Sequence, residues 1–300
     1  MCIKTFLNNL RYLFRYNLKE MYLNANTSID VNQFYTFSQK LKAEIKNEWD
    51  SIFVPKIKNP MQTLEELLTS DKSIIRFGDG EFMLIEGKDI PFQLYNADLA
   101  EKLKYIFKIN DPNLLIGGPF VYFSDTANIR NAARSFLYFG GSEIYSKIQK
   151  YCNPDTTYYS TEISQVFPIY KNYEFEKHYN LLKQILKNKK ITIITGDWIK
   201  NKIDYNILEE CSALSVNYIY APSINAYFEY DSLKQQISRI DKDNVLIFAI
   251  GPASKVIAYD MYVQGYRVLD LGHAIKDYDS YMKQEKMDAN GIYKYFSPDA

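Results

Sequence analysis

Residues 245–273, VLIFAIGPASKVIAYDMYVQGYRVLDLGH, hold the clearest structural signal in this 300-residue chain. Val245–Ile250 is a continuous apolar run that ends at Gly-Pro, as expected of a buried strand followed by a tight turn. Ala253–Gln264 has apolar residues at helical spacing, and the glycine that follows, Gly265, is suited to end a helix. Arg267–Leu271 is a second apolar run. The stretch therefore predicts a strand, a helix and a second strand parallel to the first.

The same alternation of short apolar runs and helical patterns extends back to residue 61. Strands that alternate with helices predict an α/β fold, here a Rossmann-like, mainly parallel sheet flanked by helices on both faces. Ligands of such sheets bind at the carboxyl ends of the strands. Further strands are expected at 73–77, 114–116, 156–160, 191–195 and 214–220, and helices at 61–69, 97–109, 125–139, 142–150, 174–187 and 230–240.

The first 60 residues break this pattern and are expected to form an N-terminal helical extension and linker, followed by one domain over residues 61–300. Residues 4–23 place apolar side chains on one helical stripe with basic residues between them. Such a helix suits peripheral contact with an anionic membrane surface, or packing on the protein body or on a partner subunit of a homo-oligomer. The N-terminus lacks the uninterrupted apolar region of a signal peptide. No stretch reaches the roughly 18 apolar residues of a membrane span.

Composition narrows the class of protein. The chain has 36 basic and 36 acidic residues, and this balance argues against a general nucleic-acid binder. Its three cysteines are scattered without a CxxC pair, and only two histidines accompany them. This pattern argues against a structural zinc site and fits a reducing cytoplasm. The expected location is therefore the cytoplasm, at the inner face of the membrane if the N-terminal helix binds lipid.

The segment Arg76-Phe77-Gly78-Asp79-Gly80-Glu81 follows an expected strand. In an extended chain, residues two apart point to the same side, so Asp79 and Glu81 are expected to face one point. Paired carboxylates suit Mg²⁺ or Mn²⁺, with diphosphate and water as the remaining ligands. Arg76 would add hydrogen-bond donors for a phosphate. The alternative is an ordinary Gly-Asp-Gly turn.

The segment 76–82 also resembles the signature of the GT-D-type glycosyltransferase family. Residues 250–273 resemble the C-terminal pattern of that family, G-P-x-A/S, A-Y-D, G-Y and D-x-G-H, and residues 91–95 and 225–227 match shorter blocks. The four blocks occur in the order of the family and cover about residues 61–280. The resemblance implies a Rossmann-like domain with an Asp-x-Glu metal motif and a nucleotide sugar, typically a UDP-sugar, as substrate.

Roles for individual residues follow from the resemblance and from position at strand ends. Asp79 and Glu81 would hold Mn²⁺ or Mg²⁺. Asp279, or else Asp277, would remove the acceptor proton, and a dedicated base implies inversion at the anomeric carbon. The N–H groups that open the helix after Gly251 would hold a phosphate. The residues expected to bind the donor or its nucleotide are Arg76, Gly78, Gln93, Tyr95, Asn225, Gly251, Pro252 and His273.

The chain departs from the family pattern at two places. Residues 196–200 stand where the family has an acidic residue followed by Ser-Arg, so Lys200 or Lys202 would have to replace a phosphate-binding arginine. After His273 the family is rich in Glu, whereas this chain has Asp, whose side chain reaches less far. The other histidine, His178, lies in a polar helical pattern and is expected to be exposed.

These features predict a metal-dependent, hexosyltransferase-like glycosyltransferase that moves a sugar from a UDP-sugar to a hydroxyl of a glycan or glycoprotein in cell-surface polysaccharide biosynthesis. One alternative is a phosphatase of the haloacid dehalogenase type. That class needs a second Asp followed by Thr or Val, where this chain has Glu81-Phe82. Another is a non-catalytic nucleotide-sugar-binding module.

Overall fold

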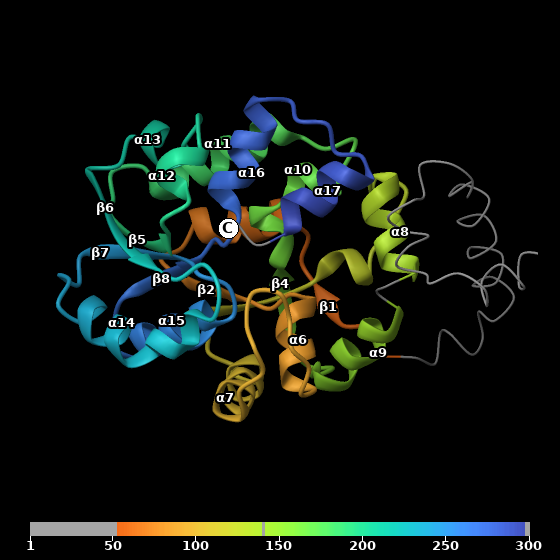
Figure 1. The fold of residues 1–300 in the computed structure, drawn as a ribbon, viewed down its shortest axis with the longest axis horizontal. Coiled ribbons are helices and arrows are strands. Elements are labelled where there is room, and N and C mark those ends of the chain that lie inside the picture. Colours follow the sequence, from red (N-terminus) through yellow and green to blue (C-terminus); the bar gives the residue numbers. More distant parts are fainter. Residues whose placement is uncertain (1–52, 140–141, 298–300) are drawn as a thin grey trace, which may run out of the picture.

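One eight-stranded sheet organises the computed structural model, which describes residues 53–139 and 142–297 (Figure 1). All paired strands run parallel, in the order β1-β4-β3-β2-β8-β7-β5-β6. The predicted α/β fold with a parallel sheet is confirmed, and the helix expected over residues 4–23 lies outside the described residues. The strands are β1 (Lys56–Ile57), β2 (Ser73–Arg76), β3 (Leu114–Gly118), β4 (Thr157–Ser160), β5 (Lys190–Gly196), β6 (Ser215–Ala221), β7 (Asn244–Ala249) and β8 (Arg267–Asp270).

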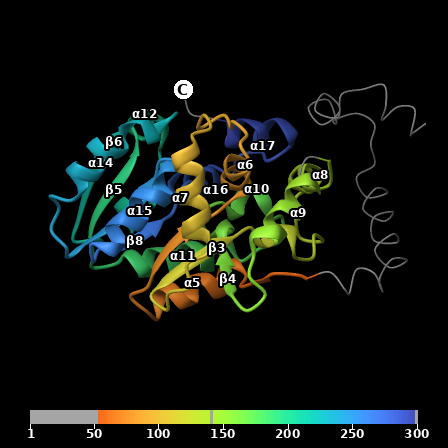
Figure 2. The ribbon, with the colours of Figure 1, turned by 90° about the horizontal axis from the view of Figure 1, so that it is seen from below.

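Helices cover both faces of the sheet (Figures 1 and 2). Neighbouring strand residues point to opposite faces, so Ile193 and Ile247 join one apolar core while Ile194 and Phe248 join the other. The core of Ile194 is covered by α6 (Asp79–Ile85), α7 (Ala97–Phe107), α9 (Ser142–Tyr151), α14 (Tyr230–Ile237) and α15 (Ala253–Val263). The core of Ile193 is covered by α5 (Pro60–Leu68), α10 (Val166–Ile169), α11 (Phe175–Leu186), α12 (Ile199–Lys202), α13 (Ile207–Glu210) and α16 (Ala274–Met282).

Shorter elements complete the domain. The helices α8 (Asn131–Phe139) and α17 (Ala289–Phe296) pack together beside α10. Three 3-10 turns follow strands or loops, namely η1 (Phe120–Tyr122), η2 (Thr161–Ser164) and η3 (Ala226–Glu229). The helix expected from residue 125 begins at Asn131, because η1 and its following turns occupy the preceding residues. No helix in the described part of the chain is long and apolar enough to cross a bilayer.

The centre of the sheet is the β2–β8 pair, where the two halves of the chain meet. The strands β1 to β4 lie on one side of this junction, and β5 to β8 lie on the other. Open α/β sheets bind ligands in the crevice at the carboxyl ends of the strands, where the strand order reverses. The topology therefore directs attention to the ends of β2 and β8.

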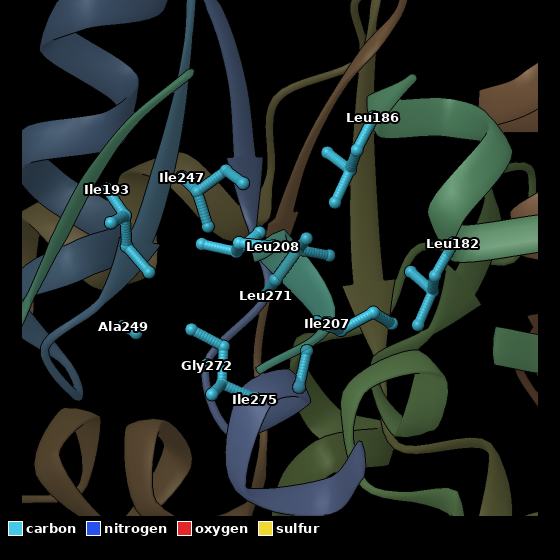
Figure 3. A pocket seen from close by; sticks show the side chains of 11 residues that line it. Leu182, Leu186, Ile193, Ile207, Leu208, Ile247, Ala249, Leu271, Gly272 and Ile275 are labelled. Atoms are coloured by element: carbon cyan, nitrogen blue, oxygen red, sulfur yellow. The ribbon is translucent and has the colours of Figure 1, made fainter. Parts of the chain in front are cut away.

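A small apolar cavity, which Leu271 and Gly272 line directly after β8, lies between the sheet and the helices α11, α13 and α16 (Figure 3). Leu182 and Leu186 face it from α11, and Ile207 and Ile275 face it from α13 and α16 (Figure 3). All eleven lining residues are Leu, Ile, Ala or Gly. The cavity thus offers no side chain for acid–base or ligand chemistry, and it belongs to the packing of the core.

Candidate functional site

The predicted acidic pair lies at the carboxyl edge of the sheet, immediately after β2. Gly78 is the extended N-cap residue of α6 (φ −98°, ψ −173°), and Asp79 is the first helical residue. The expectation that Asp79 and Glu81 lie in an extended segment is therefore wrong. In a helix, residues two apart do not share a face. Instead, Glu81 turns back and accepts a hydrogen bond from the Gly78 N–H at 2.7 Å, which satisfies a free donor of the first turn.

The two carboxylates of this pair differ in charge compensation. Glu81 is 7% exposed, and its Oε1 lies 3.2 Å from the Lys255 ammonium. Asp79 is partly exposed and makes no ion pair within the described part of the chain. Burial raises the pKa of Asp79, and the charge of Glu81 raises it further. An uncompensated carboxylate is a setting that a divalent cation relieves, so Asp79 fits the expected metal, whereas both Glu81 oxygens are already bonded, to Lys255 and to the Gly78 N–H.

A buried ionic network contacts Glu81 of this pair through Lys255. The Asp270 carboxylate at the end of β8 lies 3.1 Å from Lys255 and 3.4 Å from Arg76, and all three residues are almost fully buried. Burial alone would raise the pKa of Asp270, but the charges of Lys255 and Arg76 outweigh this effect and lower the pKa. The Arg76 Nη1 also donates to the Thr161 carbonyl at 2.6 Å. Arg76 was expected to donate to a phosphate, and in the structure its guanidinium is buried and bonded to Asp270 and Thr161.

Two glycines are required where the ends of β7 and β8 approach this network. Gly272 has φ +42°, and a Cβ there would overlap the Arg76 Nη2. Gly251 has φ +62°, which favours glycine, although a Cβ there would meet Phe92 only at an ordinary contact distance of 3.7 Å. After Pro252, the first free N–H groups of α15 are partly used, because Ser254 N donates to the Gly251 carbonyl at 3.1 Å. The phosphate site expected at this helix start therefore has fewer open donors than the sequence indicates.

His273 lies at the end of β8 and is the N-cap residue of α16. The residue is partly exposed, and aromatic side chains surround its ring, with centroids 6.4 Å from Phe92 and 5.7 Å from Tyr295. Burial lowers the pKa of His273 to about 3, and the nearby charge of Lys276 contributes to the shift. The imidazole is thus neutral at pH 7, so it would approach a phosphate as a hydrogen-bond donor rather than as a cation.

The two loops predicted to contact the donor are bonded to each other. Asn225, in the left-handed conformation (φ 57°), accepts from the Leu94 N–H at 2.8 Å, and its own N–H donates to the Phe92 carbonyl at 2.9 Å. Gln93 is 1% exposed and accepts from a backbone N–H of η3, 3.2 Å away. Gln93 and Asn225 therefore fix the loops. Tyr95 is 45% exposed and presents its ring outward.

The two predicted base candidates lie on α16 and are fully engaged. Asp277 is completely buried and accepts from the N–H groups of Val166 and Phe167, both at 3.1 Å, and from the Tyr179 hydroxyl at 2.8 Å. Burial raises the pKa of Asp277 to about 7.

Asp279 is similarly occupied. Its carboxylate accepts from the N–H groups of Asp204 and Tyr205, and it pairs with Lys283 at 2.7 Å. Neither aspartate presents an unbonded oxygen to an acceptor, so the geometry gives no support to the base role expected of Asp279 or Asp277.

Lys200 contacts an aromatic ring, and His178 is not exposed as expected. The Lys200 ammonium lies over the Tyr220 ring, 3.8 Å from its centroid. His178, expected to be exposed, is completely buried, with Nε2 at 2.8 Å from the Ile163 carbonyl and Nδ1 at 3.0 Å from the Tyr173 hydroxyl. Burial lowers the pKa of His178 to about 4.

The structure adds residues that the sequence did not identify. Glu162 follows β4, is 1% exposed, and accepts from the N–H groups of Phe120 and Val121, both at 3.2 Å. Tyr122 ends η1 nearby, and Asp79 and Glu162 are the charged groups that influence it. The position of Glu162 directly after an expected strand was a usable signal. Lys255 and Asp270 lay inside a matched sequence block but carried no predicted role.

Known proteins similar to this chain are glycosyltransferases. The probable glycosyl transferase Gly of Streptococcus gordonii is 27% identical over 219 residues, which make up 73% of this chain and 32% of that protein. Glycosyltransferase GlyD of Streptococcus pneumoniae serotype 4 is 26% identical over 225 residues, or 74% of this chain and 27% of that protein. The chain thus spans about a third or less of the length of these curated relatives.

Solved structures agree with the sequence comparisons. A structure from Streptococcus sanguinis, described as a new glycosyltransferase, superposes with a TM-score of 0.72 at 26% identity, over 77% of this chain and 85% of that chain. A second, described as a highly conserved domain of unknown function 1792 with a distinct glycosyltransferase fold, gives a TM-score of 0.69 at 28% identity, over 77% and 82% of the two chains. The family model of the glycosyltransferase GT-D fold matches residues 74–296, and this chain belongs to that family.

Proposed function

We propose that this protein transfers a hexose from a nucleotide sugar, most simply a UDP-sugar, in a reaction that depends on Mn²⁺ or Mg²⁺. The observation that carries the proposal is the Asp79 carboxylate. It lies in the first turn of α6 at the carboxyl edge of the sheet, beside Glu81 and without an ion pair in the described part of the chain. Hard oxygen ligands of this kind are the ones Mn²⁺ and Mg²⁺ prefer.

Asp79 would hold the cation together with Glu81, which Lys255 and the Gly78 N–H keep in place. When bound, the cation supplies a Lewis acid that stabilises negative charge on the departing diphosphate. His273 is neutral and partly exposed, so its ring N–H is available for a phosphate oxygen. Tyr95 is the loop side chain with an exposed ring for the donor. Asp279 as the acceptor base, with inversion as its consequence, stays a prediction from the sequence.

The acceptor belongs to the same proposal. Both curated relatives are glycosyltransferases much longer than this chain, so the domain shared with them supports the chemistry rather than the acceptor. We keep a hydroxyl of a cell-surface glycan or glycoprotein as the acceptor, reached from the cytoplasmic side. Contact of the N-terminal residues with a membrane or a partner subunit remains the proposed way of bringing enzyme and acceptor together.

Calorimetry with UDP tests the metal site directly. Wild-type protein is expected to bind UDP more tightly in Mn²⁺ than in EDTA. Asp79→Asn removes a charged metal ligand, so we expect it to cancel that gain. We also expect Glu81→Gln to reduce the gain by about tenfold or more, since even residues outside a metal's ligand shell have effects of 10–100-fold.

A matched control uses another acidic residue in the first turn of a helix. Asp98 holds that place in α7, is exposed and pairs with Lys102. Asp98→Asn should leave the Mn²⁺-dependent gain intact. Equal UDP affinity in Mn²⁺ and EDTA for the wild-type protein would contradict the metal proposal. Binding of a UDP-sugar without release of UDP in the presence of acceptor would instead favour a non-catalytic binding module.

A further inference from the structure

The Tyr122 hydroxyl occupies an unusual position at the carboxyl edge of the sheet. Tyr122 ends η1, the turn that follows β3, and its ring packs against both apolar cores. A side chain that contacts both cores must lie where they meet, at the end of the strands. Its hydroxyl oxygen is shielded from solvent and has no hydrogen-bond partner within residues 53–139 and 142–297. Native structures seldom leave a buried polar atom unsatisfied unless a water, an ion or a ligand completes it.

The surroundings of this hydroxyl are acidic and fixed. Burial raises the pKa of Tyr122 well above its usual value, and the charges of Asp79 and Glu162 raise it further. The phenol therefore stays protonated and offers one donor and two lone pairs. Glu162 is held by the Ser160 hydroxyl and by the N–H groups of Phe120 and Val121, which immediately precede Tyr122. The turn η1 thus holds Tyr122 next to residues bonded to Glu162, and Asp79 is the other charged group that acts on its hydroxyl.

The groups around this hydroxyl suit a neutral polyol. A sugar hydroxyl donates to a carboxylate such as that of Glu162 and accepts from a phenol. Asp79 is also the proposed ligand of the cation that binds the diphosphate, and the transferred sugar is attached to that diphosphate. The sugar must therefore lie within the same part of the sheet edge.

We propose that the Tyr122 hydroxyl hydrogen-bonds a hydroxyl of the transferred sugar and helps to determine which sugar is accepted. The proposal rests on the nucleotide-sugar function above and adds a specificity-determining residue to it. Sites built to bond a substrate hydroxyl discriminate strongly against analogues that lack it, because a buried polar group is then left unpaired. Tyr122→Phe should abolish this discrimination at one hydroxyl of the sugar.

The test is calorimetry on the full chain in Mn²⁺. UDP-glucose, UDP-galactose and UDP-N-acetylglucosamine are compared first, and the tightest ligand is then studied with its monodeoxy analogues. Tyr122→Phe should bind the parent sugar nucleotide about tenfold more weakly, as expected for one hydrogen bond, and should bind UDP alone as wild type does. To wild type, one deoxy analogue should bind about tenfold more weakly than the parent sugar nucleotide does. To Tyr122→Phe, the same analogue should bind no more weakly than the parent does.

Tyr170→Phe is the matched control. Tyr170 has a similarly buried hydroxyl without a partner in the described part of the chain, and Glu162 but not Asp79 influences it. We expect Tyr170→Phe to leave sugar-nucleotide affinity unchanged, and an effect as large as that of Tyr122→Phe would overturn the proposal. Equal weakening of UDP by Tyr122→Phe, or additive losses with every deoxy analogue, would also overturn it.

Stability of the ligand-free protein provides a second readout. Removing an unpartnered hydroxyl should leave the Tm of Tyr122→Phe at or above that of wild type, and a fall of several degrees would reveal a structural partner and overturn the proposal. If wild type binds none of the three UDP-sugars, the proposed function fails and this inference fails with it. If wild type binds them and Tyr122→Phe is indistinguishable, only this inference fails.

Discussion

His178 and His273 are the two histidines of the chain, and burial keeps both neutral at physiological pH. They serve different purposes. His178 is enclosed between Tyr173 and the Ile163 carbonyl, whereas His273 is a partly exposed residue at the sheet edge. Nothing in the polar helical pattern around His178 indicated burial, because its partners come from the chain segment before α11 and not from its own helix.

His178 should make the folded state sensitive to acid. Its pKa falls from 6.5 in the unfolded chain to about 4 in the folded state, so the unfolded chain binds more protons between these values. The stability contributed is complete above pH 6.5 and is lost as the pH falls toward 4. Between pH 7 and pH 4.5, we expect the free energy of unfolding of wild type to fall by about 2–3 kcal/mol more than that of His178→Gln.

Urea denaturation at the two pH values measures this difference. In both proteins His273, with a pKa of about 3, favours unfolding as the pH falls, and Asp277, with a pKa of about 7, opposes it, so the difference between the two proteins is the quantity that reports on His178. Identical losses for the wild-type and His178→Gln proteins would show that protonation of His178 is not coupled to unfolding. His178→Gln should bind UDP and Mn²⁺ like wild type, since Glu174 to Leu186 lie outside the proposed site.

At the scale of elements, the strands and the long helices were predictable from periodicity, and the short helices were not. The strand–helix–strand unit of β7, α15 and β8 lies within a few residues of its predicted bounds. The helix α6 has only seven residues and opens with Asp-Gly-Glu, so its sequence is typical of a turn. No helix was expected at α16, although it spans nine residues.

The candidate site was predictable as a location but not as a set of contacts. Parallel strand ends meet at one edge, and the structure has Asp79, Gly251 and His273 at the ends of β2, β7 and β8, as expected from the strand pattern. The partners of each charge lie far away along the chain. Arg76 contacts Asp270 across 194 positions, which no local pattern reveals. Because this partner is distant in sequence, the burial of Arg76 in the ionic network could not be predicted, and a phosphate contact was expected instead.

The junction between β8 and α16 should be intolerant of a side chain. Gly272→Ala would place a Cβ against the Arg76 guanidinium at a positive φ, and we expect a loss of about 3 kcal/mol in free energy of unfolding. Gly265→Ala is the matched control, because Gly265 also has a positive φ (+90°) but no atom within 4 Å of the added Cβ. Its loss should be only about 1 kcal/mol. Equal losses in urea denaturation would show that backbone strain, and not contact with Arg76, dominates.

At the scale of the whole molecule, the ionic network joins the two halves of the sheet. Arg76 and Glu81 belong to the half that contains β2, and Lys255 and Asp270 belong to the half that contains β8. The β2–β8 junction therefore carries buried charges as well as backbone hydrogen bonds. Since Glu81 is part of the network, the stability of the junction and the geometry of the proposed metal site depend on the same contacts.

Asp270→Asn tests this coupling. The substitution leaves two buried cations, Arg76 and Lys255, with Glu81 as their remaining nearby carboxylate. Removing one partner of a buried ionic group costs about 3–5 kcal/mol, and we expect a loss of that size in the free energy of unfolding. We also expect weaker Mn²⁺-dependent binding of UDP, because Lys255 is freed to draw Glu81 away from the cation.

Asp243→Asn is the control for the same chemical change in the same sheet. Asp243 pairs with Lys190 at the amino ends of β7 and β5, away from the proposed site, and both side chains are about half exposed. Exposed pairs contribute little to stability, so this variant should unfold and bind UDP as wild type does. If Asp270→Asn lost stability but kept full Mn²⁺-dependent affinity, the network would hold the sheet together without positioning Glu81, and the metal would then depend on α6 alone.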